Sequence, residues 1–185
     1  MEINKNKELP NMLLSHVELY VKDLKEMTAF YTEKLGFVIT DSGSGDNGMV
    51  FLSRSPNEHH QIVLSPYPSR SAKDSPVDHI SFRVDSLAHL KRFIESLLCS
   101  DEIPVQTVSH GSTWSIYFRD PEGNRFEIFT DTPWYVHQPC KFEVDFNLSD
   151  EALRASTLQV IKALPGFAMA NDWQQSHIRQ LKSND

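Results

Sequence analysis

The sequence has little of what marks several large classes of protein. Its two cysteines, Cys99 and Cys140, are too few for a secreted disulfide framework, and their spacing matches no zinc site. It has no run of basic residues, and its formal net charge of −7 argues against binding to nucleic acid or to an anionic membrane. Its apolar stretches are only a few residues long, whereas roughly 20 residues are needed to span a bilayer.

The N-terminus, MEINKNKELPNM, is polar and lacks the apolar core of a signal peptide. A chain of 185 residues suits one domain with an appendage, and a domain of this size needs no disulfide scaffold. We therefore expect a soluble, cytoplasmic, globular protein. Histidine is the unusual residue, with eight copies.

An internal repeat determines the expected fold. HVELYVKDLKEMTAFYTEKL (16–35) aligns without gaps on HISFRVDSLAHLKRFIESLL (79–98), and each copy begins with a histidine. Each copy opens with the alternation of a half-buried strand and continues with apolar residues at helical spacing. Three strand-like segments separated by turn signals follow each helix, such as the turn DPEGN (120–124). The sequence therefore predicts an α+β protein of two tandem βαβββ modules.

The expected domain spans 1–135, with module one at about 12–66 and module two at about 76–131. The segment between them, 66–76, is rich in proline and serine and is predicted to be a loop. Residues 136–185 are expected to form an extension packed on the domain, because they carry too few apolar residues for a core of their own.

The extension has three predicted elements. KFEVDFNL (141–148) alternates like a strand. Ser149 is placed to cap a helix over about 150–164, which Pro165 and Gly166 would end. A short helix is expected near 172–182.

The repeat also relates three side chains that can bind a metal ion. His16 and His79 each stand at the start of a module, and they face each other if the modules pair about a pseudo-twofold axis. Aligning HHQIVL (59–64) with RFEIFT (125–130) places Gln61 opposite Glu127. Two imidazoles and one carboxylate suit Fe²⁺ with open positions, and Zn²⁺ or Mn²⁺ are alternatives. Each residue taken singly is more often structural or solvated, but independent structural histidines need not fall at equivalent positions of a repeat.

The pattern resembles the vicinal oxygen chelate superfamily, which includes glyoxalase I, fosfomycin-resistance thiol transferases, bleomycin-binding proteins and type I extradiol dioxygenases. The resemblance rests on HVELYVKDLKEMTAFYTEKLGF, DHISFRV and SIYFRDPEGNRFEIFTDTPW, and it covers about 12–135. It implies a curved mixed-sheet cup around one metal ion held by His16, His79 and Glu127. In four-ligand glyoxalases the last strand of the first module adds a ligand, commonly Glu. Gln61, in the matching position, is a poorer ligand, which makes a glyoxalase less favoured.

Further segments resemble the small one-domain extradiol dioxygenases, which act on catechol or biphenyl-2,3-diol. NEHHQIVLSP resembles the segment with a catalytic acid–base histidine; this implies His60, with His59 as the competing choice, and an ordinary pKa of about 6.5 suits that role. HGSTWSIYFRDPEGN implies His110 and Tyr117 as further catalytic residues, and DTPWYVHQP (131–139) resembles the segment after the ligand glutamate.

The resemblance implies an oxidoreductase of aromatic catabolism that opens a catechol-like aromatic diol with O₂. Its cofactor would be Fe(II), with Mn(II) as the alternative, and its partners would be the diol, O₂ and, in a homo-oligomer, further copies of the chain. Trp114, Phe118, Trp134, Tyr135 and Phe142 are candidate aromatic walls of the substrate site, although at least half of them are expected to be ordinary core.

Three alternatives stay open. The first is another enzyme of the superfamily, a glyoxalase-type lyase or a fosfomycin-type thiol transferase. The transferase should present several cations to a phosphonate, and the basic residues beside the motifs are Arg119, Arg125, Arg70 and Lys73. The second is a non-catalytic antibiotic-binding module, a kind that generally does not keep the full ligand triad. The third is a domain that keeps the fold and the metal but has lost the reaction.

Overall fold

The computed structural model describes residues 13–43, 48–67, 69, 77–98 and 103–183, with side chains described as far as residue 176. Cys99, Arg70, Lys73 and most of the loop predicted at 66–76 lie outside these residues. The first module comprises β1 (Val17–Val21), α1 (Leu24–Ala29), the π-helical turn η1 (Phe30–Lys34), β2 (Val38–Ser42), β3 (Val50–Ser53) and β4 (Ile62–Pro66). The second comprises β5 (Ile80–Arg83), α2 (Leu87–Leu98), β6 (Gln106–Ser109), β7 (Thr113–Arg119) and β8 (Arg125–Asp131).

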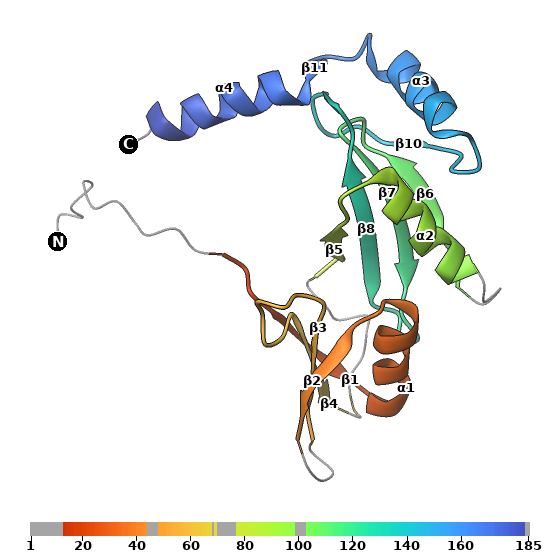
Figure 1. The fold of residues 1–185 in the computed structure, drawn as a ribbon, viewed down its shortest axis with the longest axis vertical. Helices are drawn as coiled ribbons and strands as arrows, with labels where there is room; N and C mark the ends of the chain where they lie inside the picture. Colours follow the sequence, from red (N-terminus) through yellow and green to blue (C-terminus); the bar gives the residue numbers. More distant parts are fainter. Residues whose placement is uncertain (1–12, 44–47, 68, 70–76, 99–102, 184–185) are drawn as a thin grey trace, which may run out of the picture.

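The two modules share one topology, which confirms the predicted βαβββ repeat. The first sheet has the order β1-β4-β3-β2, and the second has the order β10-β6-β7-β8-β5 (Figure 1). In each module the first strand runs parallel to the last, and the remaining pairs are antiparallel. The two sheets stay separate, so they form no closed barrel.

Local signals fix the ends of these elements. The Asp23 carboxylate caps α1 by accepting a hydrogen bond from the Glu26 N–H at 2.9 Å. Gly36 follows the first helical segment with φ +69°, a conformation that costs a glycine nothing. In the β7–β8 turn, the Asp120 carboxylate accepts the backbone N–H groups of Glu122 and Asn124.

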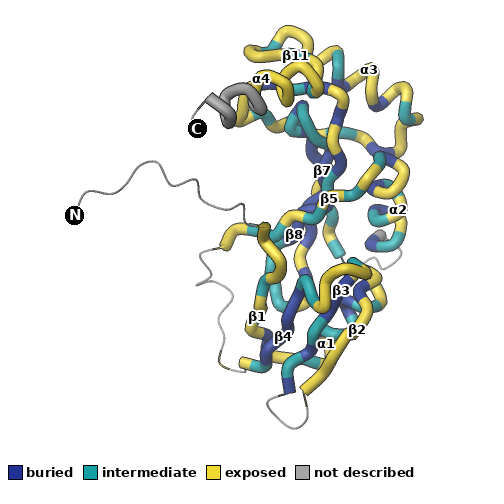
Figure 2. The backbone as a smooth tube through the Cα atoms, turned by 60° about the vertical axis from the view of Figure 1, so that its left-hand side comes forward, coloured by how far each residue is buried: buried dark blue, intermediate teal, exposed yellow. Residues whose placement is uncertain are grey.

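The core joins the two modules. Tyr31 on η1 packs edge-on against Phe126 on β8, with ring centroids 5.8 Å apart. Phe37 contacts Phe82 on β5 in the same way at 5.8 Å. Figure 2 shows the buried residues running along the strands of both sheets. The Glu122 carboxylate accepts the Lys22 N–H at 2.6 Å, so polar contacts also tie the first module to the second.

The extension adds β9 (Trp134–Tyr135), β10 (Phe142–Glu143), α3 (Asp150–Ile161), β11 (Ala168–Met169) and α4 (Ala170–Ser183). β10 adds an edge strand to the second sheet by pairing with β6. α3 packs on the domain, where the Trp114 indole N–H donates to the Thr157 hydroxyl at 2.9 Å. α4 reaches away from the sheets (Figure 1), and Trp173 stacks on Tyr135 with centroids 4.7 Å apart.

Two predictions for the extension need correction. The strand predicted over 141–148 is limited to Phe142–Glu143, because the Asp145 carboxylate and carbonyl accept the N–H groups of Asn147 and Leu148 and so close a turn. The helix predicted over 150–164 is capped by Ser149 but ends at Ile161, where a turn begins. The helix predicted near 172–182 is part of α4.

None of the helices in the described part of the chain has the length and hydropathy of a membrane span.

Candidate functional site

A buried carboxylate, Glu127 on β8, is the centre of a polar group on one face of the second sheet. Glu127 lies directly beside Ser81 on β5 and directly opposite Tyr117 on β7, so all three side chains share a face. The Tyr117 hydroxyl donates to Oε1 at 2.7 Å, and the Ser81 hydroxyl donates to Oε2 at 2.5 Å. Glu127 is only 8% exposed, and these two hydrogen bonds hold its carboxylate in a fixed orientation.

His79 immediately precedes β5 and faces the same carboxylate. Its Nε2 lies 3.5 Å from Oε2 of Glu127, and its Nδ1 lies 2.6 Å from Oδ1 of Asp78. Asp78 also accepts a hydrogen bond from Arg125 at 2.7 Å, and the Arg125 guanidinium lies 4.2 Å from the centre of the Tyr117 ring. Asp78 thus anchors one imidazole nitrogen while the other stays turned toward Glu127, the arrangement common among metal-binding histidines.

His110, in the loop between β6 and β7, extends this network. Its Nδ1 lies 2.8 Å from the Cys140 carbonyl oxygen, and its Nε2 lies 2.9 Å from the Tyr117 hydroxyl. A carbonyl oxygen only accepts, so Nδ1 carries a proton. The polar chain therefore runs from the Cys140 carbonyl through His110 and Tyr117 to Glu127.

The surroundings of Glu127 and Tyr117 set the protonation of these two side chains. Burial raises the pKa of the Glu127 carboxyl, but hydrogen bonds from Ser81, Tyr117 and Ser115, together with the nearby His79, outweigh burial and hold the pKa below its usual range. Burial, reinforced by the Glu127 carboxylate, raises the pKa of the Tyr117 phenol well above its usual value. At neutral pH the site therefore offers an ionised carboxylate and a protonated phenol.

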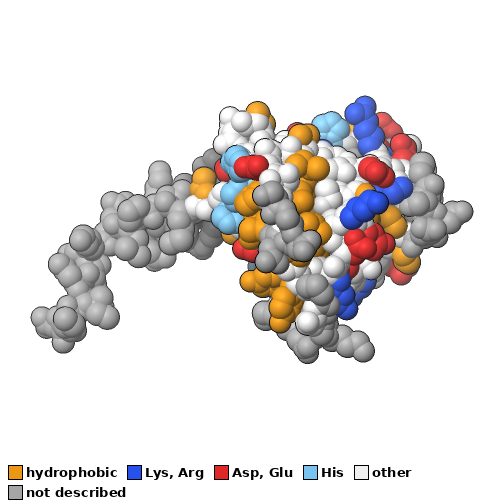
Figure 3. Space-filling model, turned by 90° about the horizontal axis from the view of Figure 1, so that it is seen from below, with side chains coloured by type: hydrophobic (Ala, Val, Ile, Leu, Met, Phe, Trp, Pro, Cys, Tyr) orange, Lys and Arg blue, Asp and Glu red, His pale blue; other side chains and the backbone are white. Residues whose placement is uncertain are grey.

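A histidine cluster stands at one end of the first sheet. The ring of His16, just before β1, lies 4.4 Å from the ring of His60. His59 Nδ1 lies 2.9 Å from His60 Nδ1, and Phe51 packs against both rings. Burial, followed by His16 and His59, lowers the pKa of His60, so this imidazole favours the neutral form. Figure 3, seen from below, shows histidine side chains gathered at the surface beside apolar side chains.

Strand pairing corrects the predicted alignment of the two modules. In the second module, Ser81 lies beside Glu127; in the first, the corresponding pair is Glu18 beside Val63. Val63, a buried apolar residue, therefore occupies the position equivalent to Glu127. The predicted match of Gln61 with Glu127 is wrong by two residues along the strand.

The chain bends at Gln61, and this bend explains the error. The Gln61 side-chain oxygen accepts a hydrogen bond from the backbone N–H of Arg54 at 2.9 Å, and this bond stabilises the connection between β3 and β4. His59 and His60 lie before β4 begins at Ile62, so strand alternation does not place them on opposite faces, and their rings are in contact. The last strand of the first module thus presents valine where a fourth metal ligand would have to stand.

The structure brings together four of the predicted site residues, His79, Glu127, Tyr117 and His110. His16 and His60 lie together in the histidine cluster instead. Within the described ranges, no three His, Cys, Asp or Glu side chains stand close enough to hold a metal ion. His79 and Glu127, with a nitrogen and an oxygen facing each other, fit two of the three predicted ligand positions.

Sequence reasoning missed two contributors. Asp78 directly precedes the predicted ligand His79, and Ser81 follows it at strand spacing, so both were open to prediction from DHIS. Among the candidate aromatic walls, Trp114, Phe118 and Trp134 are core residues. Phe142 packs against the same core, and Tyr135 pairs with Trp173.

Comparisons with known proteins identify the relatives of this chain. The sequence model of the Glyoxalase/Bleomycin resistance protein/Dioxygenase superfamily matches residues 13–128. Biphenyl-2,3-diol 1,2-dioxygenase 2 of Rhodococcus globerulus is 27% identical over 160 residues, which cover 77% of this chain and 82% of that protein. Metapyrocatechase of Pseudomonas sp. strain CF600 is 30% identical over 132 residues, covering 67% of this chain but only 41% of that protein.

Solved structures show the same fold. A glyoxylase/bleomycin resistance protein/dioxygenase domain from Frankia sp. EAN1pec superposes with a TM-score of 0.56 and 26% identity, covering 68% of this chain and all of that one. The fosfomycin resistance protein FosX from Listeria monocytogenes, solved with Mn(II) and sulfate, gives a TM-score of 0.53 at 22% identity, covering 66% of this chain and 95% of that one. The likeness to FosX concerns the fold alone.

Proposed function

The chain belongs to the glyoxalase/bleomycin resistance protein/dioxygenase superfamily, and we propose that within it the chain is an Fe(II)-dependent extradiol dioxygenase. The proposed reaction opens a catechol-like ring next to its two hydroxyl groups and places both atoms of O₂ in the product. The observation that carries the proposal is the chain Glu127–Tyr117–His110 beside His79, which joins an ionised carboxylate to a protonated phenol.

The ligand set supports a dioxygenase over a four-ligand glyoxalase. His16, His79 and Glu127 would hold Fe(II), and Val63 adds no donor at the fourth position. A set of two histidines and one carboxylate leaves positions open for a diol and O₂. Bound Fe(II) would supply the redox and Lewis-acid chemistry that brings these two reactants together. The similarity to biphenyl-2,3-diol 1,2-dioxygenase 2 and to metapyrocatechase supports the same reaction class.

The chain's own residues would bind the diol and move protons. Tyr117 keeps its hydroxyl proton and donates it to Glu127; turned from the carboxylate to an oxygen of a diol bound beside it, the same proton would make a hydrogen bond to the substrate. His110 Nε2 lies within hydrogen-bond distance of the same hydroxyl and helps to hold it in place. His60 favours the neutral form, as a base that accepts a proton from the diol must.

The proposal requires the two halves of the site to meet. His16 and His60 are held by the first module, whereas His79, Glu127 and Tyr117 are held by the second. We propose that the first module of a second copy supplies the histidines, so that the active form is a homo-oligomer with shared sites.

The proposal is tested by loading the protein anaerobically with Fe(II), Mn(II) or Zn(II) and measuring O₂ uptake on catechol, 3-methylcatechol and 2,3-dihydroxybiphenyl. We expect uptake with Fe(II) or Mn(II) that depends on the diol, and none with Zn(II). Tight metal binding without uptake on any diol would reject the dioxygenase and favour a lyase or transferase.

A further inference from the structure

A cavity of about 720 Å³ lies between the two modules, behind the candidate site. Phe82 on β5 and Ile128 on β8 line it, and both follow residues that serve the site, Ser81 and Glu127. Because successive strand residues point to opposite faces, the cavity and the Glu127 carboxylate lie on opposite faces of the same two strands. Its volume falls within the range of about 300–1,000 Å³ that is typical of small-molecule sites.

Apolar and polar side chains both line this cavity. Three phenylalanine rings come from three places, Phe37 from just before β2, Phe82 from β5 and Phe93 from α2. Phe37 and Phe82 meet edge to face with centroids 5.8 Å apart. Such walls suit a flat aromatic or other apolar group rather than a strongly hydrated one.

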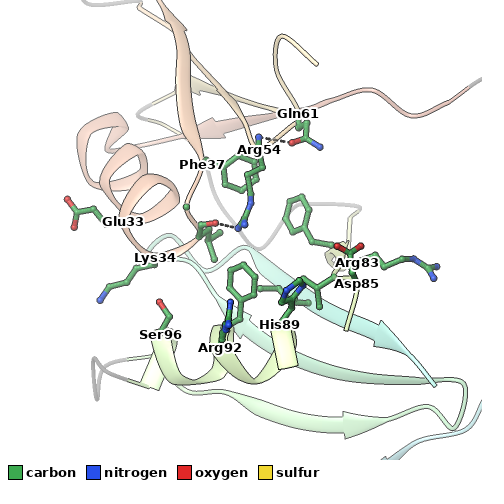
Figure 4. A pocket seen from close by; sticks show the side chains of 16 residues that line it. Glu33, Lys34, Phe37, Arg54, Gln61, Arg83, Asp85, His89, Arg92 and Ser96 are labelled. Atoms are coloured by element: carbon green, nitrogen blue, oxygen red, sulfur yellow. Dashed lines mark hydrogen bonds between the residues drawn. The ribbon is translucent and has the colours of Figure 1, made fainter. Parts of the chain in front are cut away.

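Arg54 supplies a fixed positive charge in these walls. Its guanidinium donates to the Leu35 carbonyl oxygen and lies 5.1 Å from the centre of the Phe93 ring. Its backbone N–H is bound by Gln61, which also lines the cavity. A guanidinium has five N–H donors, and among the described residues one hydrogen bond of the Arg54 guanidinium is to Leu35, which leaves donors that can face a ligand. Figure 4 shows Arg54 reaching into the space from the first module.

The cationic side chains of the lining outnumber its carboxylates, although the whole chain has a net charge of −7. The lining carries Lys34, Arg54, Arg83 and Arg92 against Glu33 and Asp85. Arg83 is paired with Asp131, and its guanidinium turns away from the cavity (Figure 4). Arg92 stands on α2, across the cavity from Arg54. The local excess of positive charge favours an anion.

We propose that this cavity is a second ligand site, which takes a small aromatic carboxylate. The ring lies among Phe37, Phe82 and Phe93, and the carboxylate binds the Arg54 guanidinium, with Arg92 as a second cation. A planar carboxylate matches a guanidinium through two parallel hydrogen bonds. The site is independent of the proposed dioxygenase reaction, because it lies on the opposite face of β5 and β8.

The test compares 2-naphthoate with its neutral analogue 2-naphthamide, by calorimetric titration of the metal-free protein. We expect the acid to bind at least tenfold more tightly than the amide. Arg54→Gln should weaken binding of the acid tenfold or more and leave the amide unchanged. Arg54 also supports the Leu35 carbonyl, so Arg92→Gln, which leaves that contact in place, provides a second test and should weaken the acid several-fold.

Two control variants locate the effect. Arg119→Gln removes a cation at the end of β7, outside the cavity, and should bind the acid like the wild type. Glu127→Gln alters the candidate metal site and should also leave binding of the acid unchanged. Equal affinity for acid and amide, an unchanged affinity in both cavity variants, or a loss of binding in Glu127→Gln would each overturn the proposal. Since no metal and no turnover are involved, the result stands whether or not the dioxygenase proposal fails.

Discussion

Tyr117 lies directly across the sheet from Glu127 and donates its hydroxyl proton to that carboxylate over 2.7 Å. The same hydroxyl lies 2.9 Å from His110 Nε2. Because a phenol has one proton, a neutral His110 and Glu127 compete for it, whereas a protonated His110 would itself donate to the tyrosine oxygen. Tyr117 therefore joins the predicted metal ligand to the predicted catalytic histidine.

Tyr117→Phe should lower kcat for ring cleavage by about 10²-fold, because it removes a hydrogen-bond donor placed at the reacting oxygen atoms. The affinity for Fe(II) should change far less, since Glu127 keeps its bond to Ser81. Steady-state O₂ uptake and metal titration measure the two effects separately. Tyr135→Phe, in a tyrosine that packs on Trp173 away from the site, is the matched control. Equal losses of metal affinity and of kcat would make Tyr117 a structural residue only.

His79→Ala should abolish stoichiometric metal binding without unfolding the protein. The side chain is 30% exposed, so its removal leaves little buried volume empty, whereas the metal loses one of three ligands. Metal content after dialysis and the thermal midpoint by circular dichroism give the two readouts. His89→Ala on the exposed surface of α2 is the control and should keep full metal content. Unchanged metal content in His79→Ala would reject the triad.

Asp78→Asn should weaken metal affinity by about 10- to 100-fold, the usual cost of removing a carboxylate that orients a ligand histidine. The physical reason is that Asp78 fixes Nδ1 of His79, and this leaves Nε2 for the metal. Nitrogen-15 NMR of the metal-free protein reports the tautomer directly: we expect the Nδ1–H form in the wild type and a mixture in the variant. Asp131→Asn, which alters another exposed carboxylate paired with an arginine, should change neither result.

Mixing two inactive variants tests whether copies share sites. His16→Ala and Glu127→Ala should each be inactive alone. If the first module of one copy completes the second module of another, co-refolded mixtures regain up to about a quarter of the wild-type activity, because random pairing leaves one intact site in half of the dimers. If each chain closes its own site, the mixtures stay inactive.

The fold could be predicted because its signals are local. The change from alternating to helical periodicity defines the strand and helix of each module, and the DPEGN turn fixes the register of β7 and β8. That register places Tyr117 beside Glu127. The position of Gln61 could not be predicted in this way, because the register of β4 depends on its parallel pairing with β1, 45 residues away at Val17 and Ile62.

The separation of the ligands is a long-range property. Which face each module presents to the other depends on the shared aromatic core, such as the contact of Tyr31 with Phe126. No local pattern encodes that packing, so the repeat could suggest equivalent histidines but could not place them relative to each other. The cavity behind β5 arises from the same packing and leaves no motif in the sequence.

The most direct test of the central claim is the stoichiometry of O₂ and catechol consumed by the Fe(II)-loaded protein, followed together with the absorbance of the product. We predict one O₂ per catechol and a yellow ring-fission product, with neither change in Glu127→Ala. Full Fe(II) binding without O₂ consumption on catechol or its analogues would contradict the assignment of this chain as an extradiol dioxygenase.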